Sequence, residues 1–439
     1  MRKYLPFLLT PLYAFSANSF LLFRSNGWLL AAVTLLLLYV NVLAGMPGFP
    51  VPGLRMKICH HGLQMITAFL GSVVISVTAQ IVLAFTAMPK DPGGYLWNLL
   101  FCIGAHLLLF WNSILCIYLT SYQLGIKLRV LGALCGMIPV VNLVILSQII
   151  RVCSEEVDFE ANRYQRSRER IAAKVCATKY PIVLVHGVFF RDWKNFNYWG
   201  RIPEDLILHG ATLYYGNHQS ADLVADSAQE LAQRIRELVQ TTGCGKVNII
   251  AHSKGGLDCR YAIANLGIGE YVASLTTVNS PHRGCQFADY LLQKIPKAVQ
   301  NSVASTYNLA LRKLGDPNPD FMGAVGNLTA ASCRAFDAET PVPEGIYCQS
   351  IGSIMPTARG GKFPMNFSYH LMEHFEGEGD GLVSEASFRW GEKYILLRPS
   401  GNRGISHGDI IDMNRENIPG FDVRDFYVDL VSDLRQRGL

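Results

Sequence analysis

Charged residues are scarce in this chain. Asp, Glu, Lys and Arg make up 17% of its 439 residues, whereas 50% are hydrophobic. A soluble globular domain usually carries about 25% charged residues. Acidic residues are scarcest near the N-terminus, because residues 1–150 contain eight Lys or Arg and a single acid, Asp91. This deficit argues against a purely soluble protein.

The sequence also lacks a basic surface of the kind that binds nucleic acids. In residues 151–439 the 31 basic residues are balanced by 33 acidic ones, and the basic excess in residues 1–150 lies between apolar runs. Nucleic-acid-binding domains instead cluster Lys and Arg on one face. We therefore expect a membrane partner and no nucleic acid.

Long uncharged segments fill the N-terminal third. A helix needs about 20 apolar residues to cross the hydrocarbon core of a bilayer. Four segments reach that length: 27–49, 62–88, 93–125 and 130–150. Residues 4–23 form a fifth uncharged run, which Pro6 and Pro11 dilute. The sequence predicts an all-α transmembrane domain of four or five helices in residues 1–150.

Flanking charges predict the orientation of these segments. If the fourth segment ends in the cytoplasm, that side carries eight Lys or Arg near the segment ends and the opposite side carries four. The eight are Arg24, Lys90, Arg151, Arg163, Arg166, Arg168, Arg170 and Lys174, and the four are Arg55, Lys57, Lys127 and Arg129. The positive-inside rule then places the C-terminal domain on the cytoplasmic side. Eleven cysteines without a CxxC pair fit a reducing compartment and predict no zinc site.

The remaining sequence divides into a linker and a second domain. Residues 151–178 are charged and helix-forming, which suits either a juxtamembrane helix against anionic headgroups or a solvated linker. In residues 179–439, short apolar segments alternate with amphipathic ones. This alternation predicts an α/β domain with a mostly parallel sheet. The expected strands are 182–185, 211–215, 246–250, 274–278, 345–351 and 393–397.

One segment has the pattern of a nucleophile elbow. An apolar strand runs into AHSKGG, residues 251–256, and then into a helical stretch. Such a turn is tight, so it requires small residues two places before and after the nucleophile. Ala251 and Gly255 meet that requirement and identify Ser253 as the candidate nucleophile. The turn would place Ser253 at the positive end of the following helix.

A serine nucleophile needs a base and an orienting carboxylate, which should follow later in the chain. His407 lies after the last predicted strand, in GISHGDIID, where the base is expected; His282 in NSPHRG is better explained as a structural loop residue. Asp380, in the glycine-rich turn EGEGDGLVS, is the preferred carboxylate. Glu376 and Glu378 are its rivals by proximity.

The tetrahedral intermediate needs backbone N–H donors for its oxyanion. One donor should be the amide of Lys254, directly after the nucleophile. The other should come from the loop after the first strand of the domain, VLVHGVFF, and we expect it to be the amide of Val188.

Five blocks of this sequence resemble the bacterial triacylglycerol lipases of the Pseudomonas and Burkholderia type, in the α/β-hydrolase superfamily. The blocks are LVHGVFF, GRIPEDLILHGATLYYGN, KVNIIAHSKGGLDCRYAIANL, VASLTTVNSPHRGCQFAD, and EGDGLVS followed by SHGDIID. The resemblance covers roughly residues 180–439. It implies a lipid or acyl ester substrate, a triad of Ser253, Asp380 and His407, and oxyanion donors at Val188 and Lys254. The predicted location, a bacterial cytoplasmic membrane with the catalytic domain on the cytoplasmic side, rests on the apolar segments and the charge bias.

The sequence departs from this family in three ways. Lys254 replaces the Gln or Met that usually follows the nucleophile. Family members often bind a structural calcium through two aspartates; Asp409 matches one, but no partner is found upstream of Asp380. We therefore predict no cofactor and no metal. Finally, the family is secreted and soluble, whereas this domain follows predicted membrane helices.

A long insertion at about 286–343 occupies the place of the lipase lid, and its apolar residues at helical spacing suit either core packing or substrate sensing. The sequence predicts a membrane-integral serine hydrolase that cleaves carboxylic esters of lipids through an acyl-enzyme intermediate. The alternatives are a lipid acyltransferase or phospholipase with the same triad, and a catalytically inactive membrane-bound interaction module.

Overall fold

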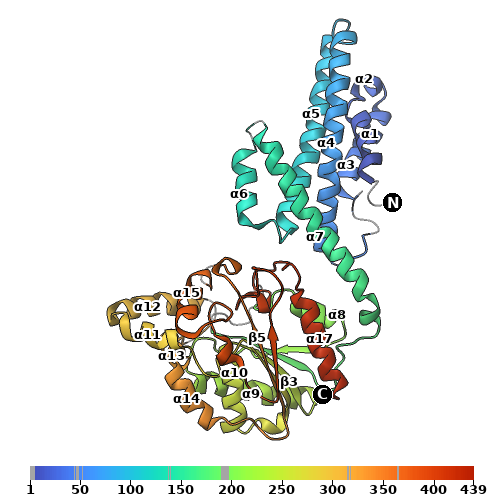
Figure 1. Cartoon of the computed structure of the whole chain (residues 1–439). Helices are drawn as coiled ribbons and strands as arrows, with labels where there is room; N and C mark the ends of the chain where they lie inside the picture. Colours follow the sequence, from blue (N-terminus) through green and yellow to red (C-terminus); the bar gives the residue numbers. More distant parts are fainter. Residues whose placement is uncertain are drawn as a thin grey trace. The chain divides into compact units, whose positions relative to one another are not determined.

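The computed structural model describes residues 5–43, 45, 49–51, 53–136, 138, 140–188, 197–313, 316, 318–362 and 365–439. The chain forms two compact units, residues 1–168 and 169–439 (Figure 1). The predicted division had the membrane part end at residue 150, before a separate linker at 151–178. Helix α7 (Val141–Ala172) spans residue 150 and most of the predicted linker.

The described residues of the N-terminal unit are almost entirely helical (Figure 1). Helices α4 and α5, of 33 and 29 residues, pack against each other and are long and apolar enough to cross a membrane. Two candidate spans are therefore present among the described residues. The helices before α7 are α1 (Leu5–Ala17), α2 (Phe20–Phe23), α3 (Gly27–Val42), α4 (Leu54–Thr86), α5 (Pro92–Thr120) and α6 (Gly125–Cys135).

The other predicted spans do not form single long helices. Helix α3 has 16 residues and α1 has 13, which is short of the about 20 needed to cross a bilayer. Residues 4, 44, 46–48, 137 and 139, which belong to predicted spans, lie outside the described residues. Segment 130–150 is divided, because α6 ends at Cys135 and α7 begins after Val140, whose φ is 68°. A left-handed residue cannot continue a right-handed helix, and hydropathy does not reveal such a break.

The C-terminal half of helix α4 buries polar side chains and exposes apolar ones, whereas its N-terminal half buries apolar residues such as Leu63 and Ile66. Its buried side chains include Ser72, Ser76 and Gln80, whereas Val74 is 67% exposed and Phe85 is 80% exposed. A helix in water buries its apolar face instead. Polar groups inside and apolar groups outside are typical of a helix bundle with apolar surroundings.

The C-terminal unit contains a six-stranded sheet in the order β2-β1-β3-β4-β5-β6, in which every pair of neighbours is parallel. The strands are β1 (Ile182–Val185), β2 (Leu213–Tyr215), β3 (Val247–His252), β4 (Val272–Val278), β5 (Tyr347–Ser353) and β6 (Lys393–Leu397). The strand order reverses direction between β1 and β3. In open parallel sheets, the crevice at such a switch point is where ligands bind.

Helices cover both faces of the sheet because strand side chains alternate. In β1, Ile182 and Leu184 join the core beneath α8 (Ile202–Leu208) and α17 (Val423–Gln436), whereas Val183 and Val185 join the core beneath α9 (Val224–Thr242) and α10 (Lys254–Asn265). A strand buried on both faces reads as a continuous apolar run. This confirms the predicted α/β-hydrolase type of fold. The other helices are α11 (Gln286–Lys294), α12 (Lys297–Lys313), α13 (Phe321–Asn327), α14 (Ala330–Glu339), α15 (Met365–Glu376) and α16 (Glu385–Phe388), with 3₁₀ turns η2 (Gly269–Tyr271), η3 (Ala358–Gly360) and η4 (Asp409–Ile411).

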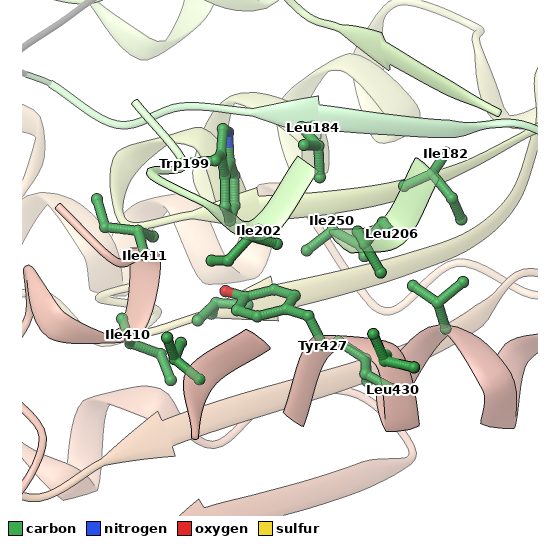
Figure 2. Close-up of a cluster of buried hydrophobic side chains, with 14 of the residues drawn as sticks. Ile182, Leu184, Trp199, Ile202, Leu206, Ile250, Ile410, Ile411, Tyr427 and Leu430 are labelled. Carbon is green, nitrogen blue, oxygen red and sulfur yellow. The ribbon is translucent and has the colours of Figure 1, made fainter. Parts of the chain in front are cut away.

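The core beneath α8 and α17 also holds the loop that follows β6 (Figure 2). Trp199 and Tyr427 are both fully buried and meet edge to face, with their ring centroids 5.9 Å apart. Ile410 and Ile411 pack into the same cluster, and they follow His407 by three and four residues. Packing around these rings therefore fixes the loop that carries the predicted base.

Trp199→Ala should lower the free energy of unfolding of the C-terminal unit by about 3–5 kcal/mol, because it removes a fully buried ring. Pulse proteolysis in urea of the detergent-solubilised chain measures this change. Phe367→Ala, at a position that is 72% exposed, is the control and should change it by less than about 0.5 kcal/mol. Equal effects of the two substitutions would show that Trp199 is not part of the stabilising core.

Candidate active site

Ser253 lies in a strained turn between β3 and α10. Its φ of 55° and ψ of −130° are rare for a residue with a side chain. Neighbouring glycines permit the turn: a Cβ at Gly255 would lie 2.4 Å from the His186 carbonyl oxygen, and one at Gly256 would lie 2.2 Å from Ser280 Oγ. The small residues found in the sequence thus have a steric cause.

The structure brings Ser253, His407 and Asp380 together from three separate loops. His407 Nε2 lies 3.0 Å from Ser253 Oγ, and His407 Nδ1 lies 2.6 Å from Asp380 Oδ2. A carboxylate only accepts hydrogen bonds, so Nδ1 carries the hydrogen and Nε2 accepts from the serine hydroxyl. All three residues are buried. This is the geometry of a nucleophile, a base and an orienting acid.

Asp380 is held by its neighbours as well as by His407. Its Oδ1 accepts from the amides of Leu382 at 2.9 Å and Val383 at 2.7 Å, and its Oδ2 accepts from Asn279 Nδ2 at 2.7 Å. These donors fix the direction of the carboxylate. Sequence reasoning missed Asn279. Its position directly after β4, in NSPHRG, was the available signal.

The rival acids and histidines make other contacts. Glu376 binds the Gln286 amide and Ser384 Oγ, and Glu378 pairs with Arg398 at 2.6 Å. His282 is buried, with its ring nitrogens 3.1 Å from Arg260 and 2.9 Å from Thr277. Burial, together with the neighbouring Arg260, lowers the pKa of His282 well below its usual value.

A second imidazole supports the site from beside the base. The His252 ring lies 4.5 Å from that of His407, and its Nδ1 is 2.7 Å from the Tyr198 hydroxyl. The Tyr198 hydroxyl also accepts from the Gly187 amide at 3.0 Å, which links the loop after β1 to the His252 ring. Burial, and then the neighbouring His407, lower the pKa of His252 well below its usual value. His252 therefore stays neutral when His407 takes up a proton.

The two predicted oxyanion donors occupy matching places at the switch point. Val185 of β1 pairs in register with Ala251 of β3, and Val188 and Lys254 each lie three residues further on. As the first residue of α10, Lys254 has an amide without an acceptor inside the helix. A Cβ at Gly187 would lie 2.9 Å from Ser253 Cβ, so this loop closely approaches the nucleophile. Residues 189–196 of the loop lie outside the described residues.

The predicted insertion at 286–343 forms helices α11 to α14, and it packs over the oxyanion loop. Leu311 and Ala324 of the insertion are buried against Val188 and Ala221. The outer face of α12 is different, since Val299 is 49% exposed and Val303 is 42% exposed. Part of the insertion is thus core, whereas α12 presents apolar groups to the outside.

The side chain of Lys254 is buried and paired. Its Nζ lies 2.8 Å from Asp258 Oδ1 and 2.8 Å from Ser227 Oγ, and Asp258 Oδ2 lies 3.2 Å from His218 Nε2. Burial raises the pKa of Asp258 to about 6, and Lys254 opposes that rise. The ammonium group is thus bound inside the protein and does not extend into solvent.

Asp409, the weak calcium candidate, has a different partner. Arg403 binds both of its carboxylate oxygens, at 2.7 and 3.1 Å, and Ser406 Oγ donates to it at 2.7 Å. A guanidinium in this position occupies the carboxylate that a calcium ion would need. Asp409 therefore does not fit the role of a calcium ligand.

Comparison with known proteins gives partial matches to lipases. The chain is 33% identical over 177 residues to triacylglycerol lipases of Pseudarthrobacter phenanthrenivorans and Burkholderia plantarii; each match covers 38% of this chain, and 55% and 49% of those proteins. It is 26% identical over 267 residues to triacylglycerol lipase 2 of Saccharomyces cerevisiae, covering 56% of this chain and 75% of that one. The matched part of the chain is thus similar to bacterial triacylglycerol lipases. The predicted resemblance to bacterial lipases is confirmed.

The matches to lipases cover only part of each protein. The chain spans about half the length of the first curated relatives that it matches. The solved structure of Staphylococcus hyicus lipase is 16% identical, with a TM-score of 0.46, and the match covers 59% of this chain and 97% of that one. No family model matches. The predicted fusion of a lipase-like domain to membrane helices remains a prediction.

Lys254→Gln should lower the free energy of unfolding of the lipase-like domain by about 3–5 kcal/mol at pH 8, because it leaves Asp258 buried without its cation. The added substitution Asp258→Asn should restore most of this loss. Hydrolysis of a neutral ester should change by less than about tenfold, since the Lys254 amide is kept. Pulse proteolysis in urea and an ester assay measure the two effects.

The pH dependence of this loss has a defined sign. In the wild type, Asp258 has a pKa of about 6 and is ionised at pH 8. In the folded Lys254→Gln variant, Asp258 should keep its proton at that pH. The deficit should therefore shrink by about 1.4 kcal/mol per unit as the pH falls from 8 to 6. Lys297→Gln, on the exposed side of α12, is the control. A deficit independent of pH would mean that Asp258 does not sense Lys254.

Proposed function

We propose that this chain is a membrane-integral serine hydrolase that cleaves carboxylic esters of lipids. The observation that carries this proposal is the hydrogen-bonded series from Ser253 Oγ through His407 to Asp380. The partial identity to triacylglycerol lipases supports a lipid ester as the substrate. The exposed apolar face of α12 and the two apolar helices α4 and α5 support action at a lipid surface.

In the proposed reaction, His407 Nε2 removes the hydroxyl proton of Ser253 as Oγ attacks the ester carbonyl. The amides of Val188 and Lys254 donate to the oxyanion of the tetrahedral intermediate. His407 then returns the proton to the departing alcohol, leaving an acyl-enzyme. His407 Nε2 next removes a proton from a water molecule, which attacks the carbonyl of the acyl-enzyme. His407 then returns the proton to Ser253 Oγ as the bond between serine and acyl group breaks, which releases the fatty acid and the free serine.

We propose that the helical insertion acts as a lid. Leu311 and Ala324 pack against Val188 of the oxyanion loop. Movement of the insertion would therefore change the packing of that loop. Val299 and Val303 face outward from α12 and would gain an apolar environment at a lipid surface. Lid movement would then couple contact with lipid to exposure of the site.

Ser253→Ala and His407→Ala should each lower ester hydrolysis by at least about a thousandfold, because members of a triad act as a unit. Hydrolysis of a triacylglycerol and of a soluble p-nitrophenyl ester measures this loss, and a fluorophosphonate probe should label the wild type only at Ser253. The exposed-position variants Ser302→Ala and His370→Ala are the controls and should keep wild-type rates.

Three results would contradict parts of this proposal. More than about a tenth of wild-type activity in Ser253→Ala would remove Ser253 as the nucleophile. Failure of the probe to label the wild type would favour an inactive interaction module. Transfer of the acyl group to an added lipid alcohol in preference to water would identify an acyltransferase with the same triad.

The charge bias of the loops places the lipase-like domain on the cytoplasmic side of the membrane in our proposal. The eleven cysteines, all free, suit a reducing compartment. Alkaline phosphatase fused after Leu439 should therefore be inactive and a green fluorescent protein fused there should be fluorescent. Fusions after Lys127, on the predicted opposite side, should show the reverse. Active phosphatase at Leu439 would place the domain outside.

A further inference from the structure

A groove of about 360 Å³ lies between α4 and α5 in the N-terminal unit. Its lining is mainly apolar and includes Val77 and Ile81 of α4 and Ile103 of α5. Three buried polar side chains, Ser76, Gln80 and His106, also line it. Cavities of this size, with an apolar wall and few polar groups, are typical of small-molecule sites. The groove belongs to the N-terminal unit, whereas the triad belongs to the C-terminal unit.

Gln80 presents an unpaired acceptor. Asn18 Nδ2 donates to the Ala14 carbonyl oxygen at 2.7 Å and to Ser76 Oγ at 2.8 Å, which fixes Asn18 Oδ1 as an acceptor. Gln80 Nε2 donates to that oxygen at 2.8 Å. The orientation of the Gln80 amide is thereby set, and among the described residues its Oε1 has no hydrogen-bond partner.

His106 presents a second unpaired acceptor. Its Nδ1 lies 2.8 Å from the Cys102 carbonyl oxygen, so Nδ1 carries the hydrogen and Nε2 keeps a lone pair. The Tyr13 ring meets the imidazole edge to face at 5.8 Å and limits its rotation. In the part of the chain that the structure describes, His106 Nε2 has no partner. Both orphan atoms of the groove therefore require a donor.

We propose that this groove binds a single-chain lipid alcohol, with its hydroxyl donating to His106 Nε2 or Gln80 Oε1 and its acyl chain against the apolar wall. A fatty-acid carboxylate or a phosphate has only acceptors to offer, and would leave both groups unpaired. The alcohol that best matches the site is a monoacylglycerol. This choice rests on the proposed function, because cleavage of acylglycerol esters generates lipids with free hydroxyls.

Photolabelling of the full-length Ser253→Ala variant in phosphatidylcholine nanodiscs tests this inference without hydrolysis. The probe is a monooleoylglycerol with a diazirine in its chain, and the matched probe has both hydroxyls methylated. We expect the hydroxyl probe to label peptides of α4 and α5 at least fivefold more than the methylated probe. Equal labelling by the two probes would overturn the proposal, whatever the behaviour of any variant.

Substitutions locate the labelling within the groove. Val77→Trp fills it from an exposed position, and should reduce labelling at least fivefold. Val74→Trp, also exposed on α4 but outside the groove, should not reduce it. His106→Phe keeps a ring but removes the acceptor, and should weaken the preference for the hydroxyl probe. Undiminished labelling in Val77→Trp would place the lipid elsewhere and overturn the inference.

The outcomes separate this inference from the proposed function. If the chain hydrolyses lipid esters but both probes label it equally, the proposed function stands and the groove is not an alcohol site. A chain that prefers the hydroxyl probe but lacks esterase activity would retain the site and lose the proposed reaction.

Discussion

The left-handed backbone at Ser253 is the constraint on which the active site depends. A residue with φ of 55° can exist there only because β3, α10 and the neighbouring glycines hold the turn from all sides. That turn lifts the hydroxyl above the carboxyl edge of the sheet and leaves the first amides of α10 open. His407 and Asp380 reach Ser253 because β5 and β6 end at the same edge. The geometry of the site is therefore a property of the sheet.

Several polar side chains are buried around this site, and hydrogen bonds and ion pairs hold those of Asp380 and Lys254 in place. Asp380 is fixed by four hydrogen-bonded groups, including Asn279. Lys254 and Asp258 neutralise each other below the oxyanion position. An unpaired charge in either place would be costly, so these contacts couple the stability of the domain to the order of its catalytic loops.

In the N-terminal unit many apolar side chains are exposed, and polar ones such as Gln80 and His106 are buried beside apolar clusters that include Met65 and Leu109. Hydropathy predicted four or five membrane helices, whereas two helices among the described residues are long and apolar enough to cross a membrane. Helix α6 ends before Gly136, and Val140, which has a left-handed backbone, precedes α7, so the fourth predicted span is divided. The backbone conformation of one residue does not change the hydropathy of a segment, so hydropathy does not reveal this break.

The sequence by itself predicted the α/β domain, six strands of a mostly parallel sheet, the elbow at Ser253, and Asp380 and His407 as its partners later in the chain. Apolar runs, glycine spacing and an elbow pattern are local signals, so they can be read without a structure. Only the tertiary structure decided which acid meets His407, and that the His252 ring, with Tyr198 as its partner, lies beside it. These contacts join residues up to more than a hundred positions apart, and they depend on strand order and packing. Side-chain partners of that kind leave no periodic trace in a single sequence.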